Sequence, residues 1–359
     1  MMLTSSASGP VYVAGLDRSG KTTMSAMLTS HPDLAIPGVG SNLWTYFYRR
    51  YGDLRRPQNL ERCLHAMLQY KHVRYLDPDP DRIRRELLSG PITYARLLAL
   101  PLIHYAERRR KPRWGAQTGL IERYAEPLLG AHPTLRVVHL IRDPRDRYAA
   151  SLARWPGQRG RAGGAVARWR YSTALARRHQ RAHPDRYHIV RFEDLVRAPE
   201  ETVREVCDFL DLSYEPTMLD MAEAPTLVAK LGHAAPGTPG YTLLCAEHLD
   251  RDRASVRAGE QRFIERYAAG LMRIHGYEPA PAFVEPGLER LRFELVEQPS
   301  QLARLVSWRF VEELQQRWPR VVPRRPGQRM LVEPPDASGG PERPDDDPQR
   351  PASVRSGRS

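Results

Sequence analysis

The sequence predicts an α/β fold in three layers, with a central parallel sheet and helical insertions. Three short apolar segments indicate buried parallel strands: Val11 to Ala14, Arg136 to Ile141 and Tyr187 to Phe192. Loop residues and then a helical pattern of apolar side chains follow each segment. This alternation of strand and helix is typical of a parallel sheet that is covered by helices.

The first strand leads into a glycine-rich loop. Residues 15–23 read Gly-Leu-Asp-Arg-Ser-Gly-Lys-Thr-Thr, which fits the G-x-x-x-x-G-K-[ST] spacing. In such a loop the backbone N–H groups and the start of the next helix surround a phosphate, and the lysine adds a positive charge. We therefore predict a P-loop-like fold that binds an anion here. The spacing alone allows either a nucleoside triphosphate or another phosphorylated donor.

The second strand ends in a charged turn that bears on this choice. The turn reads Arg142-Asp143-Pro144-Arg145-Asp146. A triphosphatase needs an acidic residue at the end of a second strand to help hold Mg²⁺, and Asp143 occupies that place. The neighbouring arginines would oppose a metal ion, whereas the planar fork of Arg142 suits a bidentate bond to a second phosphate. The turn therefore favours a donor with two separate phosphates and no metal site.

The third strand is followed by Phe192-Glu193-Asp194-Leu195 and then by a helix. Pro199 suits the first turn of that helix. The helix keeps its apolar residues at a period of 3.6, at Val203, Val206, Phe209 and Leu210. A further helical pattern runs from Arg257 to Ile274.

The remaining segments predict the organisation of the chain. Residues 40–111 form a mostly helical insertion between the first two strands, and we expect it to build the acceptor pocket. A loop rich in Pro and Gly at 225–245 is placed to close over a ligand. We assign 1–280 to one α/β domain, 281–318 to C-terminal amphipathic helices and 319–359 to a disordered tail.

The two C-terminal helices are predicted from their apolar faces. One face carries Leu288, Leu291 and Leu295, and the other carries Leu302, Val306, Phe310 and Leu314. We expect these faces to brace the domain.

Taken together, the three strand ends resemble those of sulfotransferases that use 3′-phosphoadenosine 5′-phosphosulfate (PAPS). The family's R-S-G-T-T loop is matched by Arg18-Ser19-Gly20-Lys21-Thr22-Thr23, and its R-[ND]-P-x-D turn with a following serine by residues 142–146 and Ser151. Its [YF]-E-[DQ]-L and F-L-[GD] motifs are matched by residues 192–195 and 209–211, and its W-G-[DE]-[KQ]-T motif in part by residues 114–118. The resemblance covers residues 11 to about 278.

The resemblance implies a donor site without a metal. Residues Arg18, Ser19, Gly20, Lys21, Thr22 and Thr23 would bind the 5′-phosphosulfate, Arg142 and Ser151 the 3′-phosphate, and Phe192 would lie near the adenine. The chain departs from the family's pattern in having Lys21 in place of threonine and Ser151 nine rather than eight residues after Arg142. Ala116 and the Gly38-Val39-Gly40 segment stand where acidic residues are common.

The same resemblance implies sulfuryl transfer to a hydroxyl or amine of a small-molecule, carbohydrate or lipid acceptor. Arg18 and Lys21 are placed to neutralise charge on the bridging oxygen, and a carboxylate or histidine is needed to take the acceptor's proton. Glu122 is the first candidate for that base, followed by His31, His104 and Asp17. Two alternatives stay open: a P-loop kinase or NTPase that uses Mg-ATP, and a catalytically silent nucleotide-binding relative.

Composition limits the partners and the compartment. The net charge of +13 comes almost wholly from arginine, since lysine occurs only at positions 21, 71, 111 and 230. No basic run alternates with aromatic residues, so we expect no nucleic-acid binding. Three scattered cysteines indicate neither a disulfide framework nor a zinc site. We also find no targeting segment and no run of about 18 apolar residues, which predicts a cytoplasmic protein without a membrane span.

Overall fold

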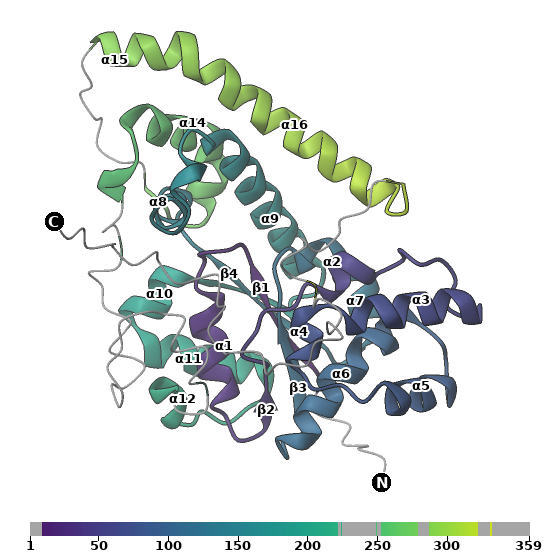
Figure 1. Ribbon diagram of the computed structural model, residues 1–359. Coiled ribbons are helices and arrows are strands. Elements are labelled where there is room, and N and C mark those ends of the chain that lie inside the picture. Colours follow the sequence, from purple (N-terminus) through teal and green to yellow (C-terminus); the bar gives the residue numbers. More distant parts are fainter. Residues whose placement is uncertain are drawn as a thin grey trace, which may run out of the picture.

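Five parallel strands form the central sheet of the computed structural model, in the order β2-β3-β1-β4-β5 (Figure 1). The structure describes residues 9–221, 224, 249, 253–278, 287–321 and 331. The strands are β1 (Val11–Gly15), β2 (Leu34–Ala35), β3 (Arg113–Gln117), β4 (Arg136–Ile141) and β5 (Tyr187–Arg191). The prediction of a three-layer α/β fold with a parallel sheet is confirmed, and the three predicted strands are β1, β4 and β5.

Two strands, β2 and β3, were not predicted because neither contains an apolar run. The first has only two residues, and the second reads Arg-Trp-Gly-Ala-Gln. Strand β3 nevertheless pairs with β1 along residues 115–117, where Gly115 brings its backbone close to that of Val11. A side chain at Gly115 would meet the carbonyl oxygen of Val11 at 2.7 Å, so close strand pairing rather than hydrophobic pattern explains this position.

Alternate side chains of β1 fill two different cores. Val11 and Val13 pack on the face covered by α1 (Lys21–Thr29), together with α10 (Phe192–Arg197), α11 (Pro199–Leu210) and α12 (Thr217–Asp220). Tyr12 and Ala14 pack on the opposite face, which is covered by the helical insertion and α7 (Ala125–Ala131). This alternation follows from the period of two along a strand, and both faces are therefore buried.

The helical insertion covers one face of the sheet. Its helices are α2 (Leu43–Phe47), α3 (Pro57–Leu68), α4 (Lys71–Arg74), α5 (Pro80–Leu88) and α6 (Tyr94–Arg108). The Asp79 side chain caps α5 by accepting hydrogen bonds from two backbone N–H groups. The Thr93 side chain caps α6 by accepting a hydrogen bond from one backbone N–H group. The insertion thus adds its own core of leucine, tyrosine and methionine side chains to the sheet.

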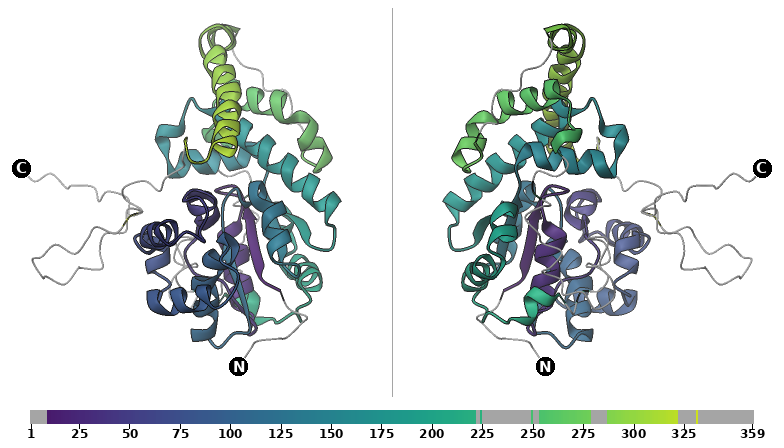
Figure 2. Two further views of the ribbon diagram at one scale, coloured as in Figure 1. Left: turned by 90° about the vertical axis from the view of Figure 1, so that its right-hand side faces the viewer. Right: turned by 90° about the vertical axis from the view of Figure 1, so that its left-hand side faces the viewer.

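A group of helices lies beyond the carboxyl ends of the strands (Figures 1 and 2). It comprises α8 (Pro144–Arg154), η2 (Pro156–Gln158), α9 (Ala162–Ala182), η5 (Arg253–Ser255), α14 (Ala258–Ile274), α15 (Gly287–Arg292), the π-helical turn η6 (Phe293–Glu297) and α16 (Gln298–Arg317). The short helix η1 (Ile121–Tyr124) connects β3 to α7 below them. Helix α16 packs along α9 and so crosses the top of the domain.

Helix α16 is held to the domain by buried polar groups together with Leu302 of its predicted apolar face, which packs against the core. Leu288, Leu295, Val306 and Phe310 are all more than 60% exposed. The buried residues of α16 are instead Gln301 and Glu312. The Gln301 side chain accepts from the backbone N–H of Gly163 at 2.9 Å and donates to the carbonyl of Gly160 at 2.7 Å.

A buried ion pair fixes the other half of α16. Glu312 pairs with Arg123 of η1, and each side chain is only 1% exposed. The Arg123 guanidinium also lies over the rings of Tyr171 and Trp308. Removing one partner of such a pair leaves an uncompensated buried charge, which typically costs about 3–5 kcal/mol.

Two predicted segments lie mainly outside the described residues. The Pro/Gly-rich loop at 225–245 is outside them entirely, and of the predicted tail only residues 319–321 and 331 are described. Leu331 forms an isolated antiparallel bridge with Tyr70. Within the described ranges, none of the helices combines the length and the hydropathy needed to cross a bilayer.

The docking of α16 gives a test of the fold. A Cβ at Gly163 would lie 1.9 Å from the carbonyl oxygen of Gln301, whereas a Cβ at Gly164 would meet nothing within 4 Å. Gly163→Ala should therefore lower the free energy of unfolding by about 1–3 kcal/mol, through overpacking. Gly164→Ala is the matched control and should raise stability by about 0.5–1 kcal/mol, because alanine favours a helix. Chemical denaturation of both variants measures the difference, and equal effects would contradict the close approach.

Candidate active site

The loop between β1 and α1 is shaped by two glycines with positive φ. Gly15 has φ 122°, and a Cβ there would lie 2.3 Å from the carbonyl oxygen of Leu140 on β4. Gly20 has φ 95°, and a Cβ there would lie 2.2 Å from the ring of Phe192. No other residue type fits either place without moving its neighbour. The loop therefore lies directly against the ends of β4 and β5.

Carbonyl groups hold the loop in place. The Ser19 hydroxyl donates to the carbonyl oxygen of Leu16 at 2.7 Å, within the loop. Two arginines donate to the loop from outside it. The Arg142 guanidinium bonds the carbonyl oxygen of Arg18 at 3.4 Å, and the Arg147 guanidinium bonds that of Asp17 at 3.3 Å. Helix α1 begins immediately afterwards and has no side-chain cap. Its first N–H groups have no partner within the helix, which makes this end suited to an anion.

Lys21 turns back across the mouth of the loop. Its side chain is 7% exposed, and its Nζ atom lies 3.7 Å from Oδ1 of the exposed Asp17. The same Nζ would lie 3.2 Å from a Cβ built at Gly119, just past the end of β3. Gly119 thus leaves room for the ammonium group, a role that the spacing of the loop alone does not reveal.

The other predicted loop residues differ in exposure. Arg18 is exposed and has φ 68°, at the outer tip of the loop. The Thr22 hydroxyl accepts from Gln117 Nε2 at 3.4 Å, and Thr23 is buried on α1. The loop and the start of α1 thus bring Arg18, Ser19, Gly20, Lys21 and Thr22 together.

Glu122 is a buried carboxyl group near this lysine. It lies on η1, is 1% exposed, and neither of its oxygens has a hydrogen-bond partner of ordinary geometry among the described residues. Burial raises its pKa, while the nearby Ser172 hydroxyl and the charges of Arg123 and Lys21 offset part of that rise. A buried carboxyl group of this kind is a candidate functional group.

Arg142 and Phe192 lie side by side at the ends of β4 and β5. The Arg142 guanidinium carbon is 4.7 Å from the centroid of the Phe192 ring, a cation–π distance. The carbonyl oxygen of Arg142 accepts from Trp169 Nε1 at 2.8 Å, which fixes the backbone at this point. Since the same ring contacts Gly20, the structure brings both predicted residues to the phosphate loop.

Ser151 makes its hydrogen bond within α8. Its hydroxyl donates to the Arg147 carbonyl at 2.9 Å within α8, and its side chain lines a cavity beside α16. Its separation from Arg142 by nine residues thus turns it toward that cavity.

The two histidine candidates for the base form hydrogen bonds away from the phosphate loop. His31 Nδ1 accepts from the N–H of Asp33 and His31 Nε2 lies 3.0 Å from the Ser213 carbonyl, at the far end of α1. His104 lies 3.0 Å from Glu86 within the helical insertion. Neither is placed at the loop, whereas Asp17 and Glu122 both lie near Lys21.

The acidic residues of the second and third motifs are structural. Asp143 accepts from the backbone and the guanidinium of Arg145, at 2.6 Å in the shortest bond. Asp146 forms a bidentate pair with Arg253, at 2.7 and 2.6 Å. These carboxylates are already neutralised by arginines, so Asp143 is not presented to the loop as a metal ligand would be.

Glu193 fastens the strand ends to each other. Its carboxylate accepts from the backbone N–H of Asp143 at 2.9 Å and from the Tyr277 hydroxyl at 3.0 Å. The sequence motif marks Glu193 but does not reveal this structural role, because its partner Tyr277 lies 84 residues further along the chain.

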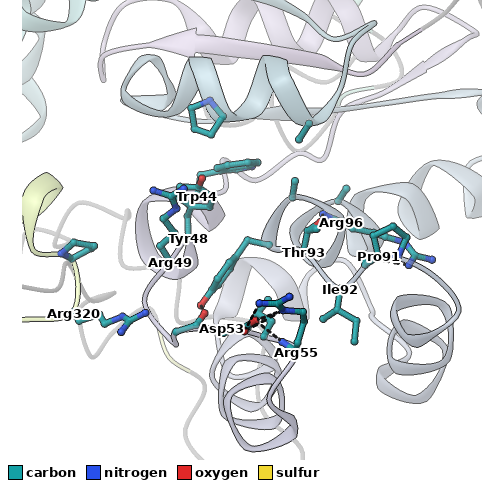
Figure 3. Close-up of a pocket in the computed structure, with 18 of the residues that line it drawn as sticks. Trp44, Tyr48, Arg49, Asp53, Arg55, Pro91, Ile92, Thr93, Arg96 and Arg320 are labelled. Carbon is teal, nitrogen blue, oxygen red and sulfur yellow. Dashed lines mark hydrogen bonds and ion pairs between the residues drawn. The ribbon is translucent and has the colours of Figure 1, made fainter.

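Two cavities adjoin this region. The larger, of about 1270 Å³, lies in the helical insertion, and Figure 3 shows aromatic and arginine side chains around it, including Trp44, Tyr48, Arg49 and Arg96. Its remaining wall comes from α7, from the end of α16 and from the segment after α16 that contains Arg320. The smaller, of about 510 Å³, lies between the phosphate loop, α8, α9 and α16.

The comparisons with known proteins agree with this geometry. Residues 10–216, more than half of the chain, match the model of the sulfotransferase family. No curated protein matches the chain. The sulfotransferase domain of the olefin synthase from Synechococcus PCC 7002 is similar in structure, with a TM-score of 0.51 and 20% identity over 77% of this chain and 97% of that domain.

A second solved structure is also similar. The sulfotransferase domain from the curacin biosynthetic pathway has a TM-score of 0.48 and 19% identity, over 76% of this chain and 99% of that domain. At these identities the likeness concerns the fold, while the family follows from the sequence match. The chain belongs to the sulfotransferase family.

Proposed function

We propose that this protein transfers the sulfuryl group of PAPS to a hydroxyl or amine of a small-molecule, carbohydrate or lipid acceptor. The observation that carries the proposal is the meeting of Arg142 and Phe192 with the phosphate loop. A donor with phosphates at both its 3′ and 5′ positions needs two cationic sites on either side of one nucleoside. The loop with Lys21 supplies one such site, and Arg142 supplies the other.

Each part of the donor has a partner of suitable chemistry. The 5′-phosphosulfate is assigned to the N–H groups at the start of α1, with Ser19, Gly20, Thr22 and Thr23 around it. The 3′-phosphate is assigned to the fork of Arg142. Phe192 offers an aromatic face to the adenine. Ser151 is not required in this arrangement.

Sulfuryl transfer then needs charge stabilisation and a base. The acceptor oxygen forms a bond to sulfur while the bond between sulfur and the 5′-phosphate oxygen breaks, and 3′-phosphoadenosine 5′-phosphate leaves. Lys21 and Arg18 neutralise the charge that grows on that leaving oxygen. Glu122 takes the acceptor's proton, and its raised pKa suits a general base.

A kinase or NTPase that uses Mg-ATP is the competing function, and the spacing of Lys21 in the loop favours it. The engagement of Asp143 by Arg145 speaks against it. A catalytically silent relative would bind the same nucleotide without turnover.

Nucleotide preference tests the donor. The wild-type protein should bind 3′-phosphoadenosine 5′-phosphate at least tenfold more tightly than ADP in isothermal titration, with EDTA present, because a charged hydrogen bond contributes about 1.5–3 kcal/mol. Arg142→Ala should remove this preference and leave weak ADP binding. Arg136→Ala, at the other end of β4, is the control and should keep the preference. Equal affinities in the wild type, or tighter ADP binding that requires Mg²⁺, would refute a PAPS donor.

The pH dependence of turnover tests the base. Glu122→Gln should lower kcat by about 100-fold, leave nucleotide binding unchanged and abolish the acidic limb of the pH profile. Burial raises the pKa of Glu122, so in the wild type that limb should lie above the ordinary carboxyl range of about pH 4. Asp17→Asn is the comparison variant. If Asp17→Asn loses the acidic limb of the pH profile and Glu122→Gln keeps it, then Asp17 is the base that takes the acceptor's proton.

The raised pKa of Glu122 also predicts how the stability of the Glu122→Gln variant changes with pH. Because the pKa of Glu122 is higher in the folded protein than in the unfolded chain, its stabilising contribution is present at low pH and is lost as the pH rises through the folded value. The melting temperature of the variant relative to wild type should therefore be higher at pH 8 than at pH 4. A difference that does not change with pH would show that Glu122 has an ordinary pKa.

A further inference from the structure

The smaller cavity adjoins the reactive end of the phosphate loop. Asp17 lines it, and Oδ1 of Asp17 lies 3.7 Å from Lys21 Nζ. The larger cavity of Figure 3 has no phosphate-loop residue among those that line it. The smaller cavity therefore gives the shorter approach to a sulfuryl group bound at Lys21, although the sequence pointed to the helical insertion as the acceptor pocket.

The walls of this cavity are strongly cationic. Arg147, Arg161, Arg168 and Arg304 line it, against a single acidic residue, Asp17. The guanidinium groups of Arg161 and Arg304 form no hydrogen bond or ion pair with any residue that the structure describes, and both side chains are exposed. Two exposed cations thus line one cavity, and neither forms an ion pair within the described part of the chain.

Arg147 is the most informative of these residues. Its side chain is only 6% exposed, and its two hydrogen bonds are long ones to carbonyl oxygens, those of Asp17 and Ala165, at 3.3 and 3.2 Å. Its Nε has no partner among the described residues. Burial lowers the pKa of Arg147 to about 10, and the charge of nearby Asp17 offsets only part of that shift. This buried guanidinium beside a cavity has an unsatisfied N–H group, and the exposed Asp17 carboxylate compensates its charge only in part.

Aromatic rings complete the cavity. Trp155 and Trp308 line it, and Trp308 is held in an edge-to-face contact with Tyr171 at 5.5 Å between ring centroids. Indole faces pack well against flat or ring-shaped ligands. The cavity therefore combines ring-binding surfaces with cationic groups.

We propose that the cavity between the phosphate loop and α16 is the acceptor site, and that it takes a ring-containing acceptor that carries an anionic group besides its hydroxyl. This inference rests on the proposed sulfuryl transfer. The anionic group, a carboxylate, phosphate or sulfate, is held by Arg147, Arg161 and Arg304, while the tryptophans hold the ring. The hydroxyl is then directed toward Lys21.

A matched pair of probes tests the charge preference. Isothermal titration of the enzyme loaded with 3′-phosphoadenosine 5′-phosphate compares 6-hydroxy-2-naphthalenesulfonate with 2-naphthol, which have the same ring and hydroxyl. The sulfonate should bind the wild type at least tenfold more tightly, as expected for charge-assisted hydrogen bonds. Equal affinities, or no binding of the sulfonate, would overturn the proposal.

Two double variants locate the site. Arg161→Gln with Arg304→Gln should reduce the preference to about threefold or less, whereas Arg49→Gln with Arg320→Gln removes the same charge from the larger cavity and should leave the preference unchanged. If the Arg49/Arg320 variant loses the preference and the Arg161/Arg304 variant keeps it, the acceptor binds in the helical insertion. Arg147 is kept intact because it also holds the Asp17 carbonyl. Arg309→Gln, on α16 and 75% exposed, is the surface control.

The two proposals fail in different ways. If 3′-phosphoadenosine 5′-phosphate does not bind the wild type, the PAPS donor is wrong. If it binds, and both naphthols then bind equally or the sulfonate does not bind, only the acceptor assignment is wrong.

Discussion

The close contact between the phosphate loop and the strand ends is the constraint on which the rest of the site depends. Gly15 and Gly20 have no side chain because Leu140 and Phe192 fill the space that one would need. The carbonyl of Arg18 is held by Arg142, just after β4, and the carbonyl of Asp17 is held by Arg147 of α8. A loop held in this way needs little rearrangement when a ligand arrives, which is what the proposed anion site requires.

The arginines of this region serve two purposes that residue type alone does not separate. Arg145 and Arg253 neutralise Asp143 and Asp146, and thereby join α8 to the segment before α14. Arg142 and Arg147 instead donate to carbonyl oxygens, those of Arg18, Asp17 and Ala165. Ion pairs of the first kind cost much to desolvate and much more to break. A carbonyl oxygen carries no full charge, so bonds of the second kind do not neutralise a guanidinium group as a carboxylate does.

Much of the fold could be predicted from the sequence, because β1, β4 and β5 carry apolar runs and end in recognisable motifs. Strand β3 was not predicted because it depends on a close backbone approach at Gly115 and not on an apolar run. The docking of α16 was not predicted because it depends on two buried polar residues, Gln301 and Glu312. The structure brings the loop residues, Arg142 and Phe192 together, and their role in binding a donor stays a prediction. The roles of Arg147 and Gly119 could not be predicted, because each depends on neighbours far away in sequence.

The pairing of Arg123 with Glu312 has a consequence for how the molecule is made. These residues are separated by 189 positions, and α16 follows every strand and the whole phosphate loop in the chain. During synthesis the loop and its strands leave the ribosome first, while the wall formed by α16 is still missing. Contacts of such long range close late, since the chain entropy of a large loop must be overcome first. The elements of the proposed anion site are therefore all synthesised before α16, which forms the far wall of the adjoining cavity.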